Sequence, residues 1–248
     1  MADAYSGLTR AYDELFPVNP RTIAYLGRAG LAPGARILDV GCASGAHPRA
    51  FAAAGYAAEG IDPSEAMIRA AREAAAGSAG GGSGAPSFKI AGMLDLARLY
   101  PGGSWDAVTC LGNTLPHLRG PAEAAEFLSQ VRAVLSPGGF LVLQFLNYRK
   151  ILAEKPSNLP RLETRDWIFE RSYRYGRGYV EFNTRLSDRE GRILSEGTVR
   201  LSPLRFETVV ELAESRSFRA AALEAGWDGE PFDPDSSTLA VLRLSLPA

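Results

Sequence analysis

The stretch Ile37-Leu-Asp-Val-Gly-Cys-Ala-Ser-Gly45 decides the fold, because a short apolar strand runs directly into a glycine-rich turn. Glycines let the backbone turn tightly and bring its N–H groups close to a ligand at the start of a helix. Asp62 ends the next apolar segment, Gly60-Ile-Asp-Pro63. It follows Gly41 by roughly 20 residues, the spacing at which an acid can bind the hydroxyls of a ribose. Together the two features predict a nucleoside-binding site at the carboxyl edge of a parallel sheet.

The turn does not match the dinucleotide pattern G-x-G-x-x-G, which would need glycine at positions 43 and 46. The chain has Ala43 and Ala46 instead. Asp39, just before the turn, suits an ammonium group better than a phosphate. A nucleoside that carries an amino acid therefore fits better than one that carries a diphosphate, and an NAD(P)-dependent oxidoreductase is the weaker alternative.

Strand and helix patterns alternate from residue 36 to residue 146, which predicts a mostly parallel sheet with helices on both faces. The glycine- and serine-rich stretch 77–86 predicts a flexible loop inside this domain, because the alternation continues after it. Residues 5–29 predict helices interrupted at Pro17 and Pro20. After Asn147, three segments of alternating apolar and polar residues predict an antiparallel meander. Residues 217–225 predict a helix, and residues 239–246 a final strand.

We therefore expect three parts. Residues 1–33 form a helical lid, residues 34–149 and 214–248 form the α/β core, and residues 150–213 form a small antiparallel insert that serves as a substrate lobe or a dimer lobe.

Composition excludes several classes of function. The chain has 248 residues, 27 basic and 28 acidic, so its net charge of −1 argues against a nucleic-acid partner or an anionic membrane surface. Two histidines and two cysteines, with no C-x-x-C or H-E-x-x-H spacing, predict no metal site. Few cysteines, no signal-peptide pattern and no long apolar run lead us to expect a cytoplasmic protein, monomeric or homodimeric.

The glycine turn, Gly60-Ile-Asp62 and Trp105-Asp-Ala-Val-Thr-Cys-Leu-Gly-Asn113 together resemble the class I S-adenosylmethionine-dependent methyltransferases. The pattern is nearest to that of small-molecule members similar to glycine N-methyltransferase. The resemblance covers residues 34–146, with residues 217–246 completing a seven-stranded sheet. It implies a Rossmann-like α/β fold and S-adenosyl-L-methionine as cofactor.

The resemblance also implies a role for individual residues. Gly41, Cys42, Ala43 and Gly45 would surround the methionine part, Asp62 would bind the ribose, and Pro63 and Met67 would flank the adenine. Gly92 stands where the family often has an aspartate, so adenine recognition would fall to Met93 and Leu94, with Asp95 as a weaker candidate. Leu111 would lie against the cofactor, Asn113 would face the methyl-donor region, and Tyr12, in the N-terminal lid, would cover the cofactor.

His117, in Leu111-Gly-Asn-Thr-Leu-Pro-His117, is the candidate catalytic residue, as a general base or an orienting group. The alternative is a histidine at a helix start that bonds only to backbone. The expected reaction moves a methyl group to N, O or S of a small-molecule acceptor by in-line displacement. A non-catalytic protein that binds S-adenosylmethionine or S-adenosylhomocysteine is the main alternative.

Overall fold

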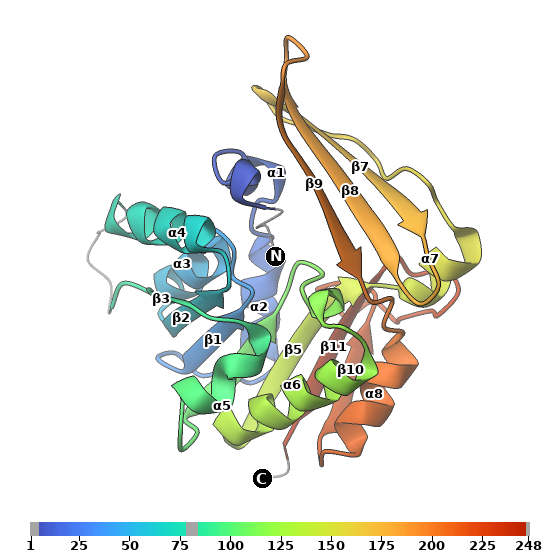
Figure 1. Cartoon of the computed structure of the whole chain (residues 1–248). Helices are drawn as coiled ribbons and strands as arrows, with labels where there is room; N and C mark the ends of the chain where they lie inside the picture. Colours follow the sequence, from blue (N-terminus) through green and yellow to red (C-terminus); the bar gives the residue numbers. More distant parts are fainter. Residues whose placement is uncertain (1–4, 78–83, 247–248) are drawn as a thin grey trace.

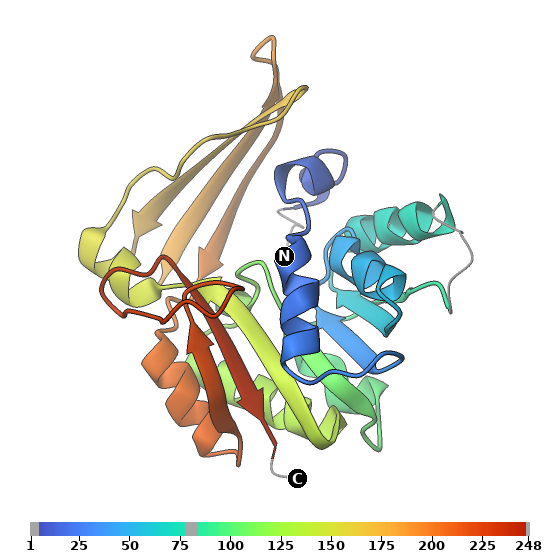
Figure 2. The same ribbon diagram turned by 180° about the vertical axis from the view of Figure 1, so that it is seen from behind.

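The computed structural model describes residues 5–77 and 84–246, and it places seven strands in one twisted sheet (Figures 1 and 2). The strand order is β10-β11-β5-β4-β1-β2-β3. Neighbouring strands run parallel from β5 to β3, whereas β11 runs antiparallel to both β5 and β10. The bounds are β1 Arg36–Val40, β2 Ala57–Asp62, β3 Ser87–Ile90, β4 Trp105–Cys110, β5 Leu135–Leu146, β10 Arg219–Glu224 and β11 Leu239–Ser245. The predicted mostly parallel seven-stranded sheet is confirmed.

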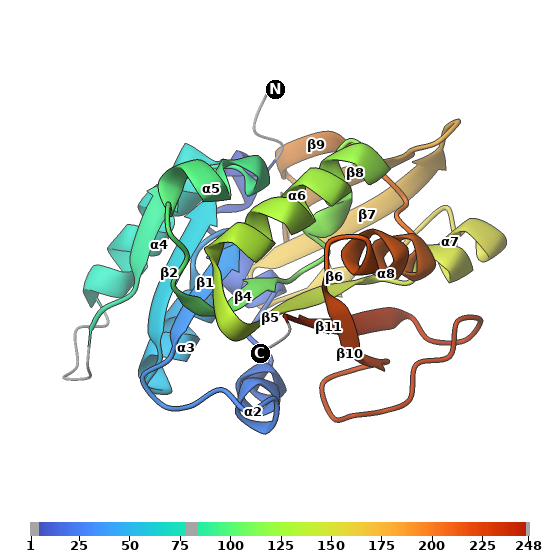
Figure 3. The ribbon, with the colours of Figure 1, turned by 90° about the horizontal axis from the view of Figure 1, so that it is seen from below.

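Helices cover both faces of this sheet, as Figure 3 shows from below. Successive residues of a strand point to opposite faces, so Ile37 belongs to the apolar cluster on the side of α2 and α3, while Leu38 belongs to the cluster on the side of α6 and α8. Both side chains are fully buried. The helices of this domain are α2 Pro20–Arg28, α3 Ala46–Ala53, α4 Glu65–Gly77, α5 Leu96–Leu99, α6 Pro121–Val134 and α8 Phe206–Glu214, with the 3-10 turns η2 Met93–Asp95 and η3 Leu115–His117.

A second, antiparallel sheet stands above the carboxyl edge of the first, and α7 Tyr148–Glu154 leads into it (Figure 1). Its strands are β6 Leu162–Glu163, β7 Trp167–Tyr175, β8 Val180–Asp188 and β9 Ile193–Leu201, in that order. Alternation along β7 buries Phe169 and Tyr173 and exposes Glu170 and Arg174. We call the face that carries Phe169 and Tyr173 the inner face. The predicted meander is confirmed.

The N-terminal segment, residues 5–16, lies between the two sheets (Figure 1). It contains η1 Ser6–Leu8 and α1 Tyr12–Leu15. Leu8 and Leu15 pack in one apolar cluster with Ala43 of the glycine turn and Phe169 of the inner face. Gly7 lies against β9 so closely that a Cβ there would meet Ser195 Oγ at 2.1 Å. The segment therefore contacts both parts of the molecule.

The predicted helix at residues 217–225 is wrong, because residues 219–224 form strand β10. The alanines of Arg219-Ala-Ala-Ala-Leu-Glu224 favour a helix by intrinsic propensity. Backbone pairing with β11 overrides that preference. The helix near this position is α8, which packs on the core through Val209 and Ala213 rather than on the antiparallel sheet. Of the predicted loop at 77–86, residues 78–83 lie outside the described residues.

Candidate active site

The glycine turn after β1, residues 41–45, is held by backbone bonds to β2 and is called the cofactor loop below. The N–H groups of Gly41 and Cys42 donate to the carbonyl of Ile61 at 2.8 and 2.9 Å. Gly41 has φ +75°, and a Cβ there would lie 2.3 Å from Thr114 Cγ2. Glycine is thus required both by the backbone conformation and by close packing on the segment after β4.

Asp62 links the cofactor loop to the end of β2. Its Oδ2 accepts a hydrogen bond from the Ala43 N–H at 3.0 Å, and its Oδ1 accepts one from the Ser64 N–H at 2.9 Å. Ser64 in turn caps α4, since its Oγ accepts from the Met67 N–H at 3.2 Å. Each carboxylate oxygen can accept more than one hydrogen bond, so these bonds are compatible with ribose binding.

Asp39 lies under the cofactor loop and is 2% exposed. Its Oδ1 accepts a hydrogen bond from Thr109 Oγ1 at 2.6 Å. Burial raises the pKa of Asp39 to about 7, against the lowering effect of the Thr109 bond, and the negative charge of Asp62 adds to the rise. A cation placed next to this carboxyl would favour its ionised form.

The N-terminal segment is fastened to the cofactor loop by Asp13. Its carboxylate accepts from Ser44 Oγ and pairs with Arg49 Nη2 at 2.6 Å. Tyr12, the next residue back, is partly buried and packs against the apolar cluster that contains Ala43 and Met67. Burial and the negative charges of Asp62 and Asp13 raise its pKa. The structure therefore places Tyr12 beside the cofactor loop, to which the Ala43 N–H and Asp62 also belong through their hydrogen bond.

The segment after β4, residues 111–117, meets the end of β5 through Asn113. This residue has φ +64°, and its Oδ1 accepts from the Leu146 N–H at 3.1 Å. Its Nδ2 donates to the hydroxyl of Tyr148 at 3.2 Å, and Tyr148 is completely buried. Leu111 is buried at the start of the same segment. Asn113 thus fixes where α7 begins relative to the core.

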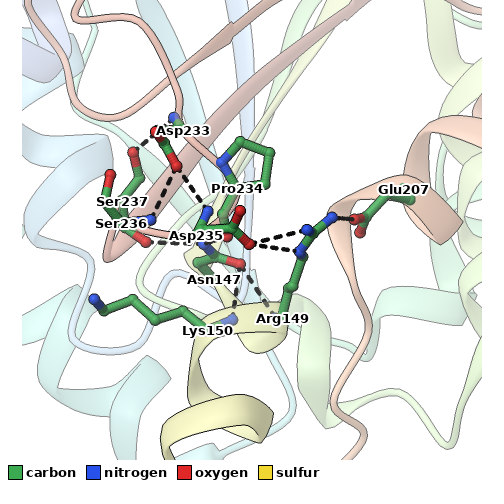
Figure 4. A network of polar contacts seen from close by, with 9 residues as sticks. All are labelled: Asn147, Arg149, Lys150, Glu207, Asp233, Pro234, Asp235, Ser236 and Ser237. Atoms are coloured by element: carbon green, nitrogen blue, oxygen red, sulfur yellow. Dashed lines mark hydrogen bonds and ion pairs between the residues drawn. The ribbon is translucent and has the colours of Figure 1, made fainter.

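A polar network holds the start of α7 from the other side (Figure 4). Asn147 Nδ2 donates to the carbonyls of Pro234 and Ser237 at 2.8 and 2.9 Å, while its Oδ1 caps α7 by accepting from the N–H of Arg149 at 3.1 Å. Arg149 also bridges Glu207 and Asp235, at 3.1 and 2.9 Å. The network therefore holds the start of α7 where the Tyr148 hydroxyl accepts the hydrogen bond from Asn113.

His117 lies under the N-terminal segment, not on an open surface. Its Nε2 is 3.2 Å from the Tyr5 hydroxyl, and the two rings meet edge to face with centroids 5.6 Å apart. Burial lowers the pKa of His117 to about 4, so the imidazole is neutral at pH 7. A neutral imidazole retains one acceptor nitrogen.

The remaining candidates differ in how they are placed. Met67 is buried against the N-terminal segment, whereas Pro63 is exposed. The side chain of Cys42 packs with Ile68 and Phe88, away from the N-terminal segment, so only its backbone belongs to the loop surface. Near the end of β3, the Gly92 N–H donates to Asp95 Oδ2 at 2.9 Å, so Asp95 serves there as a helix cap. Met93 and Leu94 are partly buried beside the core.

Sequence reasoning missed three residues that the structure brings to this site: Asp13, Arg49 and Tyr148. Asp13 and Arg49 carried no signal, because their pairing joins a short helix to α3 across 36 positions of sequence. Tyr148 did carry a signal in the sequence, because it directly follows Asn147 at the carboxyl end of β5. Ligands of open α/β sheets bind at that edge.

Residues 5–77 and 84–246 hold no cluster of three or more histidine, cysteine or acidic side chains arranged to bind a metal ion. None of their helices is both long enough and apolar enough to span a bilayer.

Comparison with known proteins agrees with the geometry. Residues 37–139 match the family described as "Methyltransferase domain". This part of the chain, about two fifths of its length, is similar to that family. The match covers the cofactor loop, Asp62 and the segment after β4, so the resemblance drawn from the sequence is confirmed.

Among curated proteins, the ubiquinone biosynthesis O-methyltransferase of Xanthomonas campestris pv. campestris is 35% identical over 136 residues, which is 54% of this chain and 52% of that protein. The chain thus matches about half the length of such relatives.

Two solved structures share the whole fold, each with a TM-score of 0.81. A S-adenosylmethionine-dependent methyltransferase from Clostridium acetobutylicum is 12% identical and aligns over 99% of this chain and 100% of its own. The CcbJ methyltransferase from Streptomyces caelestis is 22% identical and aligns over 99% of this chain and 98% of its own. These likenesses establish that the methyltransferase domain and the antiparallel sheet together form a known fold.

Proposed function

We propose that this protein transfers the methyl group of S-adenosylmethionine to N, O or S of a small-molecule acceptor by in-line displacement. One observation carries the proposal: the Asp62 carboxylate, the cofactor loop and Tyr12 meet at the carboxyl edge of the sheet. The domain family of residues 37–139 supports it. When bound, S-adenosylmethionine supplies a methyl carbon already attached to a positively charged sulfur.

The residues of this site fit that molecule. Asp62 is placed to accept from ribose hydroxyls, and the Asp39 carboxyl to pair with the amino acid ammonium. Met67, Met93 and Leu94 are proposed to supply apolar surface for the adenine, beside Pro63 and Gly92, and Leu111 to lie against the cofactor next to Asn113. Backbone groups of Gly41 to Gly45, with Asn113, are proposed to hold the methionine part. The Tyr12 ring suits a sulfonium, through a cation–π attraction of about 0.5–2 kcal/mol.

His117 is proposed to act as a general base where the acceptor arrives protonated. Its low pKa keeps the imidazole free of a proton at neutral pH. Tyr5, 3.2 Å away, orients the ring. A neutral amine acceptor needs no base, and then the chain only has to hold the reactants in line. Such positioning can lower the activation free energy by about 7–11 kcal/mol.

The acceptor is proposed to lie between the 111–117 segment and the inner face of the antiparallel sheet, which makes residues 150–213 a substrate lobe. We propose a cytoplasmic enzyme that works as a monomer or homodimer without nucleic acid. Both cysteines are buried and unpaired, which suits a reducing compartment.

Calorimetry with S-adenosylmethionine tests the site. Asp62→Ala should raise the dissociation constant at least about tenfold, since a charged acceptor contributes about 1.5–3 kcal/mol per hydrogen bond. Asp106→Ala is the matched control, because Asp106 also accepts a backbone N–H, from Arg36 at 2.8 Å, but at the opposite end of the sheet. Equal affinity of the wild type and Asp62→Ala would refute the assignment. Tight binding without methyl transfer to any acceptor pool would favour the non-catalytic alternative.

A further inference from the structure

The inner face of the antiparallel sheet carries one arginine, Arg171, at its centre. Phe169 and Tyr173 flank it on strand β7, and alternation places all three on the same face. Phe169 packs with the N-terminal segment and Ala43, whereas Tyr173 packs with Tyr148. Arg171 therefore lies between the cluster over the cofactor loop and the cluster around α7.

The neighbours of Arg171 across the sheet are small. Thr184 of β8 stands opposite it, and Gly197 of β9 is next in the same row. Arg171, Thr184 and Gly197 thus form one cross-strand row on the inner face. Arg171 is the only large side chain of that row.

Arg171 lacks the carboxylate partner that other arginines of this sheet have. On the outer face, Arg185 pairs with Glu196 at 2.8 Å, and Arg200 approaches Glu181 at 3.5 Å. No ion pair joins Arg171 to any carboxylate of residues 5–77 and 84–246; its Nη2 donates to the Pro160 carbonyl at 2.6 Å, and its Nε is buried with no acceptor there.

Arg171 also lies over the Phe169 ring, with its Cζ 5.8 Å from the ring centroid. A ring and a single carbonyl are weaker partners for a partly buried guanidinium than a carboxylate is. Burial accordingly lowers the pKa of Arg171. Across the site, the carboxyls of Asp39 and Asp62 stand at the cofactor loop. The site thus has acidic groups at one end and a basic group at the other.

We infer that Arg171 binds a carboxylate of the methyl acceptor and so selects acceptors that carry one. The inference rests on the proposed function and adds the chemical class of the substrate. An acceptor bound in this way has its anionic end at the antiparallel sheet and its nucleophilic atom toward the cofactor loop.

Benzoate and benzamide test this, since they are alike in size and shape and differ in charge. The binding of each to the full chain loaded with S-adenosylhomocysteine is measured by calorimetry. We expect the wild type to prefer benzoate by about tenfold or more, because charge-assisted pairs are stronger than neutral hydrogen bonds. Arg171→Met should abolish the preference and Arg171→Lys should retain part of it. Arg174→Met, on the outer face of the same strand, should leave it intact.

Each other outcome contradicts the inference. Equal or undetectable binding of the two probes by the wild type overturns it, and so does a preference that survives in Arg171→Met with an unchanged melting temperature. If Arg171→Met instead weakens S-adenosylhomocysteine itself by about tenfold, the anion is the carboxylate of the cofactor. Failure of the wild type to bind S-adenosylhomocysteine would refute the proposed function as well, so the two failures are distinguishable.

Discussion

At the scale of the residue, Asp39 shows how the fold changes the chemistry of a side chain. In the sequence, Asp39 is simply an acidic residue two positions before Gly41, where the glycine turn begins. In the structure its only side-chain hydrogen bond among those described is with Thr109, and burial raises its pKa to about 7. The carboxyl therefore titrates near neutral pH rather than in the usual acid range, and its charge responds to whatever binds above it.

Asp39→Asn should change how stability depends on pH. An unfolded aspartate has a pKa of about 3.9, so between pH 3.9 and about 7 the folded protein holds a proton that the unfolded chain has lost. This group therefore makes the free energy of unfolding fall as pH rises through that window. The variant removes the effect, so its melting temperature relative to wild type should increase from about pH 5 to about pH 7 and then stay level.

Differential scanning calorimetry without ligand gives the measurement, with Asp106→Asn as the control. A difference between Asp39→Asn and wild type that stays constant across this range would show that Asp39 ionises normally.

At the scale of the element, α7 is a short helix whose position depends on its first residues. Asn147 is 2% exposed and makes bonds in two directions, to the helix N–H groups and to the carbonyls of the 233–237 loop (Figure 4). Its neighbour Tyr148 carries the hydroxyl that meets Asn113. The 233–237 loop thus helps to position Tyr148 at the candidate active site.

Asn147→Ala should lower the free energy of unfolding by about 2–4 kcal/mol, from the lost cap and from carbonyls left without a donor. Urea denaturation monitored by circular dichroism measures this. Asn158→Ala is the comparison, since Asn158 is exposed and its side chain makes one long bond, 3.4 Å to Ser157 Oγ. A loss below about 0.5 kcal/mol, the usual size for surface positions, would show that the network contributes little.

At the scale of the whole molecule, the N-terminal segment joins two sheets that otherwise meet mainly near α7 and η3. Its apolar residues contact both the cofactor loop and the inner face, and Asp13 fastens it to α3. A ligand enclosed beneath it would add contacts to both sides. Ligand binding and ordering of the N-terminal segment should therefore be coupled.

S-adenosylmethionine should slow amide hydrogen exchange in residues 5–16 as well as in residues 41–45, because each region is expected to contact it. Helix α6, on the far side of the core cluster, supplies the internal reference and should show little change. Protection confined to residues 41–62, with none in 5–16, would mean that the N-terminal segment does not cover the ligand. Mass spectrometry of peptides from the full chain measures all three regions.

The sequence by itself determined the strand, glycine turn and second strand that end in Asp62, since those features depend on local pattern and short spacing. The carboxyl-edge placement of Asn113 and His117 follows from strand order in the same way. Only the tertiary structure decided that Tyr5 meets His117 across 112 positions, and that Asn113 meets Tyr148. It also turned the alanine-rich residues 219–224 into a strand and left Arg171 without an anion. The physical reason is the same throughout: helix propensity and residue type act locally, whereas strand pairing, burial and charge compensation depend on neighbours that only packing supplies.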